Sequence, residues 1–214
     1  MLKRVLFIWH NRHPASGYVQ GMCDLSMPFL TVFLSEYLPY LPQEVRFNPG
    51  PESLSPDTLE AVEADMYWCM SKLMESVTNN YTQGFDGIRI AYTRVEELLA
   101  RIDNDLLEHF RKEKIDFFAV SFRNISTMLL RMFTPNVGIR LFDTYIACEG
   151  NFPELMVFIF IAIVEKFARK LLSMRFEELM GFLQNLPTRD WDETDLEMVI
   201  AEAFCYQGIF AEKQ

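Results

Sequence analysis

The segment best suited to carry chemistry runs from Arg12 to Asp24 and reads RHPASGYVQGMCD. Pro14 and Gly17 are expected to end one helix and let the next begin, which places residues 18–21 at a loop-to-helix junction. Gly21 has no Cβ, so a second backbone or a ligand can approach it closely. The amide of Gln20 offers two donors and one acceptor. Such a side chain can orient a water molecule, as glutamines do in GTP hydrolysis.

The four-residue pattern Y-x-Q-G is a weak signal when it is taken alone. A plainer interpretation is that Tyr18 packs, Gln20 is solvated and Gly21 eases a turn. The remaining segments of the chain decide between these interpretations.

Five segments follow one known family in order and at its spacings. With GYVQGMCDL, they make the chain resemble the TBC-domain Rab GTPase-activating proteins, and most closely the subgroup with HPASGYVQG at this junction. The resemblance covers nearly all of the sequence. The matching segments are HPASGYVQGM, DMYWCMSKLME (65–75), FRNISTMLLRMF (122–133), IRLFDTYI (139–146) and FLQNLPTRDWDETDLEMVIAEAF (182–204).

The resemblance implies a function and assigns roles to individual residues. Gln20 would be the catalytic glutamine finger that orients the attacking water in a GTP-loaded Rab GTPase. The residues expected to shape this loop and contact the partner are Tyr18, Gly21, Met22, Cys23 and Asp24. The partner would hold GTP and Mg²⁺, so no cofactor of the chain's own is expected, and the chain would be an activator acting in trans rather than an enzyme.

Three departures from the family pattern bear on this function. The family's arginine finger lies in an I-x-x-D-x-x-R motif upstream of Y-x-Q-G, and no such motif occurs in the 214 residues. Cys23 stands where the family usually has asparagine, and Asn124 and Phe142 stand where it usually has tryptophan. The alternative function is therefore a weak or inactive Rab-binding or scaffolding module.

Other residue patterns favour structural roles. His10 and His13 have no third ligand at helical spacing, so a metal site is not expected and they are interpreted as surface or capping residues. No G-x-x-x-x-G-K, G-x-S-x-G or G-x-G-x-x-G pattern occurs, so no nucleotide-binding loop is expected. Arg123 and Asp143 are expected to form internal ion pairs or caps, and the methionines to fill the core.

Helical periodicity runs through most of the chain and predicts an all-α, multi-helical fold. The resemblance implies that residues 1–214 form part of a TBC-type domain, its C-terminal two-thirds. Apolar residues recur every three or four positions, as in Leu59, Val62, Met66 and Met70. A loop with five prolines is expected at 39–56, and two bundles with a boundary near 110–115 are considered. The predicted helices are 2–11, 18–38, 57–77, 87–102, 104–112, 115–131, 135–147, 152–172, 175–185 and 194–207.

Turn and capping residues support these boundaries. Ser55-Pro56 and Thr134-Pro135 each place an N-cap residue before a proline at the first helical position. Asn151 and Gly150 are expected to separate two helices near Phe152-Pro153. Thr194 and Glu197 are expected to form the capping box of the last helix.

Composition and charge limit the classes of partner. The formal net charge is −10, which disfavours nucleic acid and anionic membrane surfaces as partners. The four cysteines are dispersed and suggest a reducing, cytoplasmic location. The resemblance implies a position peripheral to endomembranes through the GTPase. The apolar run from Leu155 to Val164 is too short to span a bilayer and is predicted to be a buried helix.

The N-terminal helices are expected to expose apolar side chains. In the family, further helices pack on the segment that begins here, so residues 2–11 and 18–38 are expected to have uncovered faces. Val5, Leu6, Phe29, Val32 and Phe33 are the residues concerned, and the chain is expected to melt at a low temperature, to bind a hydrophobic dye or to dimerise through this surface.

Overall fold

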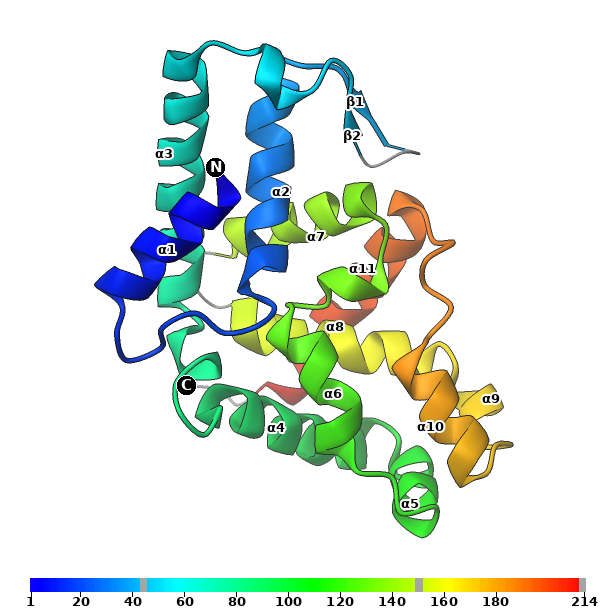
Figure 1. The fold of residues 1–214 in the computed structure, drawn as a ribbon. Coiled ribbons are helices and arrows are strands. Elements are labelled where there is room, and N and C mark those ends of the chain that lie inside the picture. Colours follow the sequence, from blue (N-terminus) through cyan, green and yellow to red (C-terminus); the bar gives the residue numbers. More distant parts are fainter. Residues whose placement is uncertain (43–45, 149–151, 212–214) are drawn as a thin grey trace.

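The computed structural model describes residues 1–42, 46–148 and 152–211, and helices make up most of this part of the chain (Figure 1). The first three helices form one block at the upper left of Figure 1 and the remaining helices form the rest of the molecule. The helices are α1 (Leu2–Arg12), α2 (Met22–Ser35), α3 (Pro56–Glu75), α4 (Asp86–Ile102), α5 (Asn104–Lys112), α6 (Phe117–Ser126), α7 (Pro135–Ala147), α8 (Phe152–Glu165), α9 (Ala168–Leu171), α10 (Phe176–Gln184) and α11 (Glu193–Phe210).

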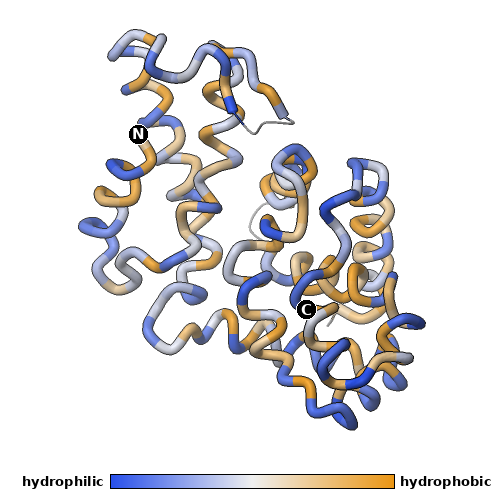
Figure 2. The backbone as a smooth tube through the Cα atoms, turned by 45° about the vertical axis from the view of Figure 1, so that its right-hand side comes forward, coloured by the Kyte–Doolittle hydropathy of each residue, from blue (hydrophilic) through white to orange (hydrophobic). Residues whose placement is uncertain are grey.

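Helix α8 lies at the centre of the larger block. Every residue from Leu155 to Val164 is buried, which confirms the buried helix predicted for this run. Helices α4, α7 and α11 pack around it, while α2 packs on α3 and also contacts α7. Hydrophobic and hydrophilic residues alternate along most of the other helices (Figure 2), as expected where a helix buries only one face.

One continuous hydrophobic core joins the two blocks. It runs from Val5 and Trp9 on α1 to Ala203 on α11. Helix α4, before the considered boundary at 110–115, packs against α6 and α8, which follow it. The chain therefore does not divide into two bundles at that boundary.

The proline-rich segment 39–56 contains more structure than a plain loop. Two short strands, β1 (Tyr40–Leu41) and β2 (Arg46–Phe47), pair antiparallel, and the rings of Tyr40 and Phe47 lie 5.1 Å apart. A 3₁₀ turn, η1 (Pro51–Ser53), leads to α3. The strands are two residues long, too short for the alternation that predicts a strand from sequence.

Several predicted helix boundaries are wrong. The helix predicted at 18–38 begins only at Met22, because residues 13–21 form the loop described below. The helix predicted at 115–131 ends at Ser126, where Met128 and Leu129 have positive φ angles, and a 3₁₀ turn, η3 (Leu130–Met132), follows. The helix predicted at 152–172 is divided into α8 and α9.

The caps are partly as predicted. The Ser55 side chain accepts a hydrogen bond from the Thr58 amide, whereas Thr134 occupies its N-cap position without a side-chain bond. The capping box of α11 is formed by Asp192 and Asp195, not by Thr194 and Glu197. Helix α11 begins one residue earlier than predicted, so the capping residues shift along the chain. The interpretation of Gly150 and Asn151 falls outside the described residues.

The surface of the N-terminal block differs from the expectation. Val5 and Phe29 are buried, because they face the core between α1, α2 and α3, whereas Val32 is 46% exposed as predicted. The most exposed apolar side chain of α1 is instead Phe7, at 66%. Among the described residues, no helix has the length and apolar character needed to cross a membrane.

Candidate functional site

Gln20 lies in a short exposed loop between α1 and α2, and residues Tyr18–Gly21 are called the glutamine loop here. The Gln20 side chain is exposed, whereas the following residues Gly21 and Met22 are buried. Gly21 is the N-cap of α2 and has φ +107°. An L-residue rarely adopts this conformation, so glycine at this position allows the chain to enter the helix directly after Gln20.

The N-terminal side of the glutamine loop is held by α1. The backbone N–H of Tyr18 donates to Nδ1 of His10 over 3.1 Å. The backbone N–H of Gly17 donates to the carbonyl of His13 over 2.7 Å, and the His13 ring stacks on buried Trp9 at 3.6 Å. His10 within α1 and His13 at its C-cap thus determine where the loop begins.

The C-terminal side of the loop is held by α2 and by the end of α6. The Met22 N–H donates to the Val19 carbonyl at 3.1 Å, and the Val19 N–H donates to Sδ of Met22 at 3.3 Å. A Cβ built on Gly21 would lie 3.6 Å from Cγ2 of Thr127. The loop backbone therefore packs on Thr127, the C-cap residue of α6.

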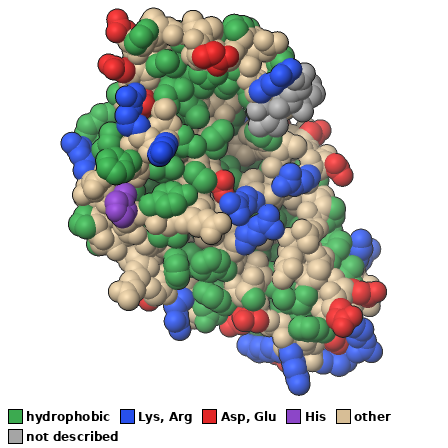
Figure 3. Space-filling view, viewed as in Figure 1, with side chains coloured by type: hydrophobic (Ala, Val, Ile, Leu, Met, Phe, Trp, Pro, Cys, Tyr) green, Lys and Arg blue, Asp and Glu red, His purple; other side chains and the backbone are tan. Residues whose placement is uncertain are grey.

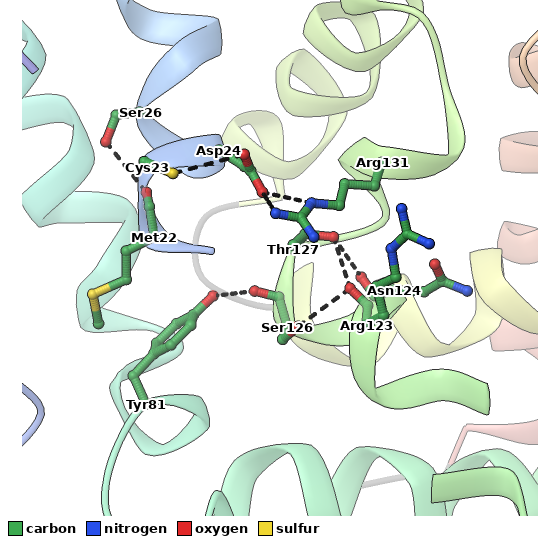
Figure 4. Close-up of polar contacts among 10 residues, drawn as sticks. All are labelled: Met22, Cys23, Asp24, Ser26, Tyr81, Arg123, Asn124, Ser126, Thr127 and Arg131. Carbon is green, nitrogen blue, oxygen red and sulfur yellow. Dashed lines mark hydrogen bonds and ion pairs between the residues drawn. The ribbon is translucent and has the colours of Figure 1, made fainter. Parts of the chain in front are cut away.

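An ion pair fixes the first turn of α2 to the segment after α6 (Figure 4). Nε and Nη2 of Arg131 each lie 2.7 Å from the same oxygen of Asp24, and both side chains are partly buried. The Cys23 thiol, 3.8 Å from the other Asp24 oxygen, donates to it. Cys23 thus keeps a donor, though a weak one, at the position where the family usually has an asparagine amide.

The Tyr18 phenol is protonated at neutral pH, and its surroundings strengthen this state. Its pKa is raised, first by desolvation and then by the nearby Cys23 and Asp24 groups. The side chain is nevertheless 47% exposed. Tyr18 therefore presents a hydroxyl donor on the surface two residues before Gln20.

A groove of about 210 Å³ begins at Asp24 and Arg131 and continues between α2, α7 and the β1 strand. Its walls are mainly apolar, with the ion pair at one end. Residues that line it include Met27, Pro28, Tyr40, Phe133 and Ile139. It gives the surface beside the glutamine loop a concave shape.

A second Y-x-Q-G sequence occurs at Tyr81–Gly84, and sequence reasoning overlooked it. Gln83 is exposed and Gly84 has φ +95°, so this loop also leads into a helix, α4. Its tyrosine differs, because Tyr81 is only 2% exposed and its hydroxyl donates to the Ser126 carbonyl over 2.7 Å (Figure 4). The four-residue pattern alone therefore does not identify the functional loop.

The structure brings all the predicted site residues, 18 and 20–24, into one place, and it adds three that the sequence analysis did not assign to the site. His10 was interpreted as a surface or capping residue, and it caps the glutamine loop. Thr127 and Arg131 lie in the matched segment 122–133, which was the only available signal for them. Their contacts with the loop join residues more than 100 positions apart in sequence.

The interpretation of Arg123 and Asp143 as internal ion pairs or caps is wrong. Both side chains are exposed, and neither forms an ion pair with another described residue. Met128 and Met132 are buried, as predicted for core-filling methionines. Phe142 is buried against the rings of Phe29 and Tyr145, so it keeps the aromatic packing at one departure from the family pattern.

Comparison with known proteins identifies the family. A family model described as Rab-GTPase-TBC domain matches residues 1–172. The chain is 38% identical over 213 residues to GTPase-activating protein gyp1 of Schizosaccharomyces pombe and to TBC1 domain family member 22B of Homo sapiens. Each alignment covers 99% of this chain and 41% of the relative, so the chain spans about two fifths of these proteins.

A solved structure gives the same result. The crystal structure of the Ypt/Rab-GAP domain of Gyp1p superimposes with a TM-score of 0.90 and 41% sequence identity. The match covers 98% of this chain and 65% of that one. These similarities in sequence and fold extend over almost the whole chain, which therefore belongs to the Rab-GTPase-TBC domain family.

Proposed function

We propose that the chain binds a GTP-loaded Rab GTPase and inserts Gln20 into the partner's active site to orient the attacking water. The observation that carries this proposal is the exposed Gln20 side chain on a loop held at both ends by His10, Met22 and Thr127. A neutral amide on a fixed backbone can bind water and donate to developing negative charge without reorganising.

The partner supplies the nucleotide and Mg²⁺ in this proposal, and the chain supplies positioning. The apolar groove beside Asp24 offers a concave surface on which the GTPase could rest, with Tyr18 and residues 21–24 shaping the contact. The four cysteines are free, in keeping with a cytoplasmic location at whichever membrane carries the GTPase.

The second candidate function is a Rab-binding module with weak activation. One observation favours it: at the position where the family usually has an asparagine amide, the Cys23 thiol is only a weak donor to Asp24. The family's arginine finger is not among the 214 residues. An arginine finger contributes roughly 10³–10⁵ in rate. Single-turnover hydrolysis by this chain, compared with a version extended upstream with the family's motif, separates the two functions. Equal rates would show that no upstream arginine is needed.

The test of the glutamine role compares Gln20→Ala with Gln83→Ala. Both residues are exposed, and both occupy Y-x-Q-G loops before a helix, so the second variant is a matched control. We expect Gln20→Ala to lower single-turnover GTP hydrolysis by about 10²-fold or more while binding of the GTPase is kept. Gln83→Ala should leave hydrolysis unchanged. Full activity in Gln20→Ala would refute the role.

A further inference from the structure

A second pocket, of about 260 Å³, is lined by Arg131, which also lines the apolar groove. It is formed by the end of α6, the η3 turn and the segment between α10 and α11. Three arginines, Arg123, Arg131 and Arg189, line it together with the polar side chains of Asn124, Gln184 and Asn185. It is called the arginine pocket here.

The charge of the arginine pocket is unbalanced. Arg131 is matched by Asp24, but Arg123 and Arg189 have no ion pair, hydrogen bond or ring contact from their side chains within the described part of the chain. None of the residues that line the pocket carries a carboxylate. The carboxylate of Asp192, three residues beyond Arg189, instead caps α11 by accepting from the Asp195 amide at 3.0 Å.

This concentration of positive charge stands out in a chain of net charge −10. Figure 3 shows basic side chains gathered in the middle of one face, over the segment that follows α6. Arg123 and Arg189 line the same pocket, and their like charges disfavour one another, so an anion bound in the pocket would be stabilising. Guanidinium groups bind carboxylates through paired hydrogen bonds.

The position of the pocket indicates the source of the anion. Arg131 lines both the arginine pocket and the apolar groove, and its ion pair with Asp24 fixes the helix that begins after Gln20. A protein that inserts its active site around Gln20 and rests on the groove would extend over the pocket. An anionic membrane is a poorer occupant, because the net charge of the chain repels it.

We propose that the arginine pocket binds the carboxylates of an acidic segment of the partner GTPase, and that Arg123 and Arg189 thereby select and orient the partner. The identity of the partner rests on the proposed function. Because such charges act mainly on the rate and specificity of association, the arginines should influence binding more than the hydrolysis step that Gln20 serves.

The main test reverses the two unpaired charges. Arg123→Glu with Arg189→Glu is compared with Arg89→Glu and Lys112→Glu, which make the same charge change at exposed residues of α4 and α5 outside the pocket. The probes are Rab GTPases loaded with a non-hydrolysable GTP analogue. We expect the pocket variant to bind at least about tenfold more weakly at low ionic strength, with a smaller loss at high salt. The control variant should bind within about twofold of the parent.

A neutral variant separates lost attraction from added repulsion. Arg123→Gln with Arg189→Gln should weaken binding in the same direction but by less, while turnover at saturating GTPase stays near the parent value. Circular dichroism checks that each variant is folded. Equal binding by the parent and the pocket variants, with activation intact, would overturn this inference and leave the proposed function standing.

If no Rab GTPase binds the parent chain, the proposed function and the identity of the partner are both refuted. Small probes then test whether the pocket binds carboxylates. A peptide of six glutamates should then bind the parent but not the Arg123→Gln, Arg189→Gln variant, and a six-glutamine peptide should bind neither. Inorganic phosphate is the third titrant. Binding of phosphate without binding of the glutamate peptide would assign the pocket to a phosphate ligand and overturn the inference.

Discussion

Replacing Gly21 by alanine should disturb the glutamine loop through backbone conformation rather than through a clash. The new Cβ would meet Cγ2 of Thr127 at 3.6 Å, which is ordinary van der Waals contact. The φ angle of +107° is the difficulty, since an L-residue held with positive φ costs about 1–2 kcal/mol. For a domain of this size, 1 kcal/mol corresponds to about 2–4 °C in Tm.

The expected result is a Tm lower by roughly 2–8 °C, measured by circular dichroism. Net stability of a domain is about 5–15 kcal/mol, so the variant remains folded at 25 °C. Single-turnover hydrolysis at that temperature then reports on the loop itself. We expect activation to fall by about tenfold or more, because misplacing a catalytic group by about 1 Å already has large effects on rate.

Gly181→Ala is the matched control. Gly181 lies within α10, and a Cβ there would meet nothing within 4 Å. Alanine in a helix interior is more favourable than glycine by about 0.5–1 kcal/mol, so this variant should melt slightly higher with activation unchanged. If Gly21→Ala melted at or above the parent, or activated the GTPase normally, the conformational role assigned to Gly21 would be wrong.

Three further predictions follow from named contacts. Asp24→Asn should weaken the ion pair with Arg131 and lower the free energy of unfolding by about 1 kcal/mol, as measured in thermal melts. GTP hydrolysis should fall by more than this loss of stability explains. Hydrolysis at the parent rate would argue against a bracing role for the ion pair. Burial and neighbouring carboxylates raise the pKa of Glu165 from 4.5 to about 7. The folded state therefore binds the proton more tightly, and stability should fall as pH rises from about 4.5 to 7. Urea titrations at several pH values should show that the free energy of unfolding falls less steeply with pH in Glu165→Gln than in the parent. Identical pH profiles for the two proteins would contradict the raised pKa of Glu165. Phe7→Ser should reduce dimerisation, because the Phe7 side chain is 66% exposed on the expected contact surface. Light scattering measures this as a lower average molar mass. An unchanged molar mass would mean that Phe7 is not part of a dimer contact.

Sequence periodicity predicted most helices because the energetic signal is local. The helices at 104–112 and 135–147 have the predicted limits, and the buried run at Leu155–Val164 was recognised from its composition. The interior of α8 is apolar all round, and its depth in the fold follows directly from that. The start of a helix is harder to predict where two residues that can cap it lie close together in sequence. Asp192 and Thr194 are such a pair at the start of α11, and Asp192 is the cap in the structure.

Tertiary contacts decided the features that the sequence did not reveal. Val5 is expected from the sequence to be uncovered but is buried, because its burial depends on how α2 and α3 pack against α1. The bare Y-x-Q-G pattern could not separate residues 18–21 from 81–84, since both are turns with glycine before a helix. Only the surrounding contacts do so: Tyr81 is a buried anchor that donates to Ser126, whereas Tyr18 remains on the surface beside Gln20.

The end of α6 explains why these two loops and the arginine pocket occur together. The helix stops at Ser126, and the positive φ angles of Met128 and Leu129 turn the chain away from the helix direction. Such angles cost free energy in non-glycine residues, but both side chains are fully buried, which offsets the cost. The turn leaves the Ser126 carbonyl free to accept a hydrogen bond from the Tyr81 hydroxyl. It also places Thr127 against Gly21. Farther along, it brings the Arg131 guanidinium to the Asp24 carboxylate. A helix continued to residue 131, as its apolar pattern alone predicts, would not turn the chain in this way, and the brace on the glutamine loop depends on that turn.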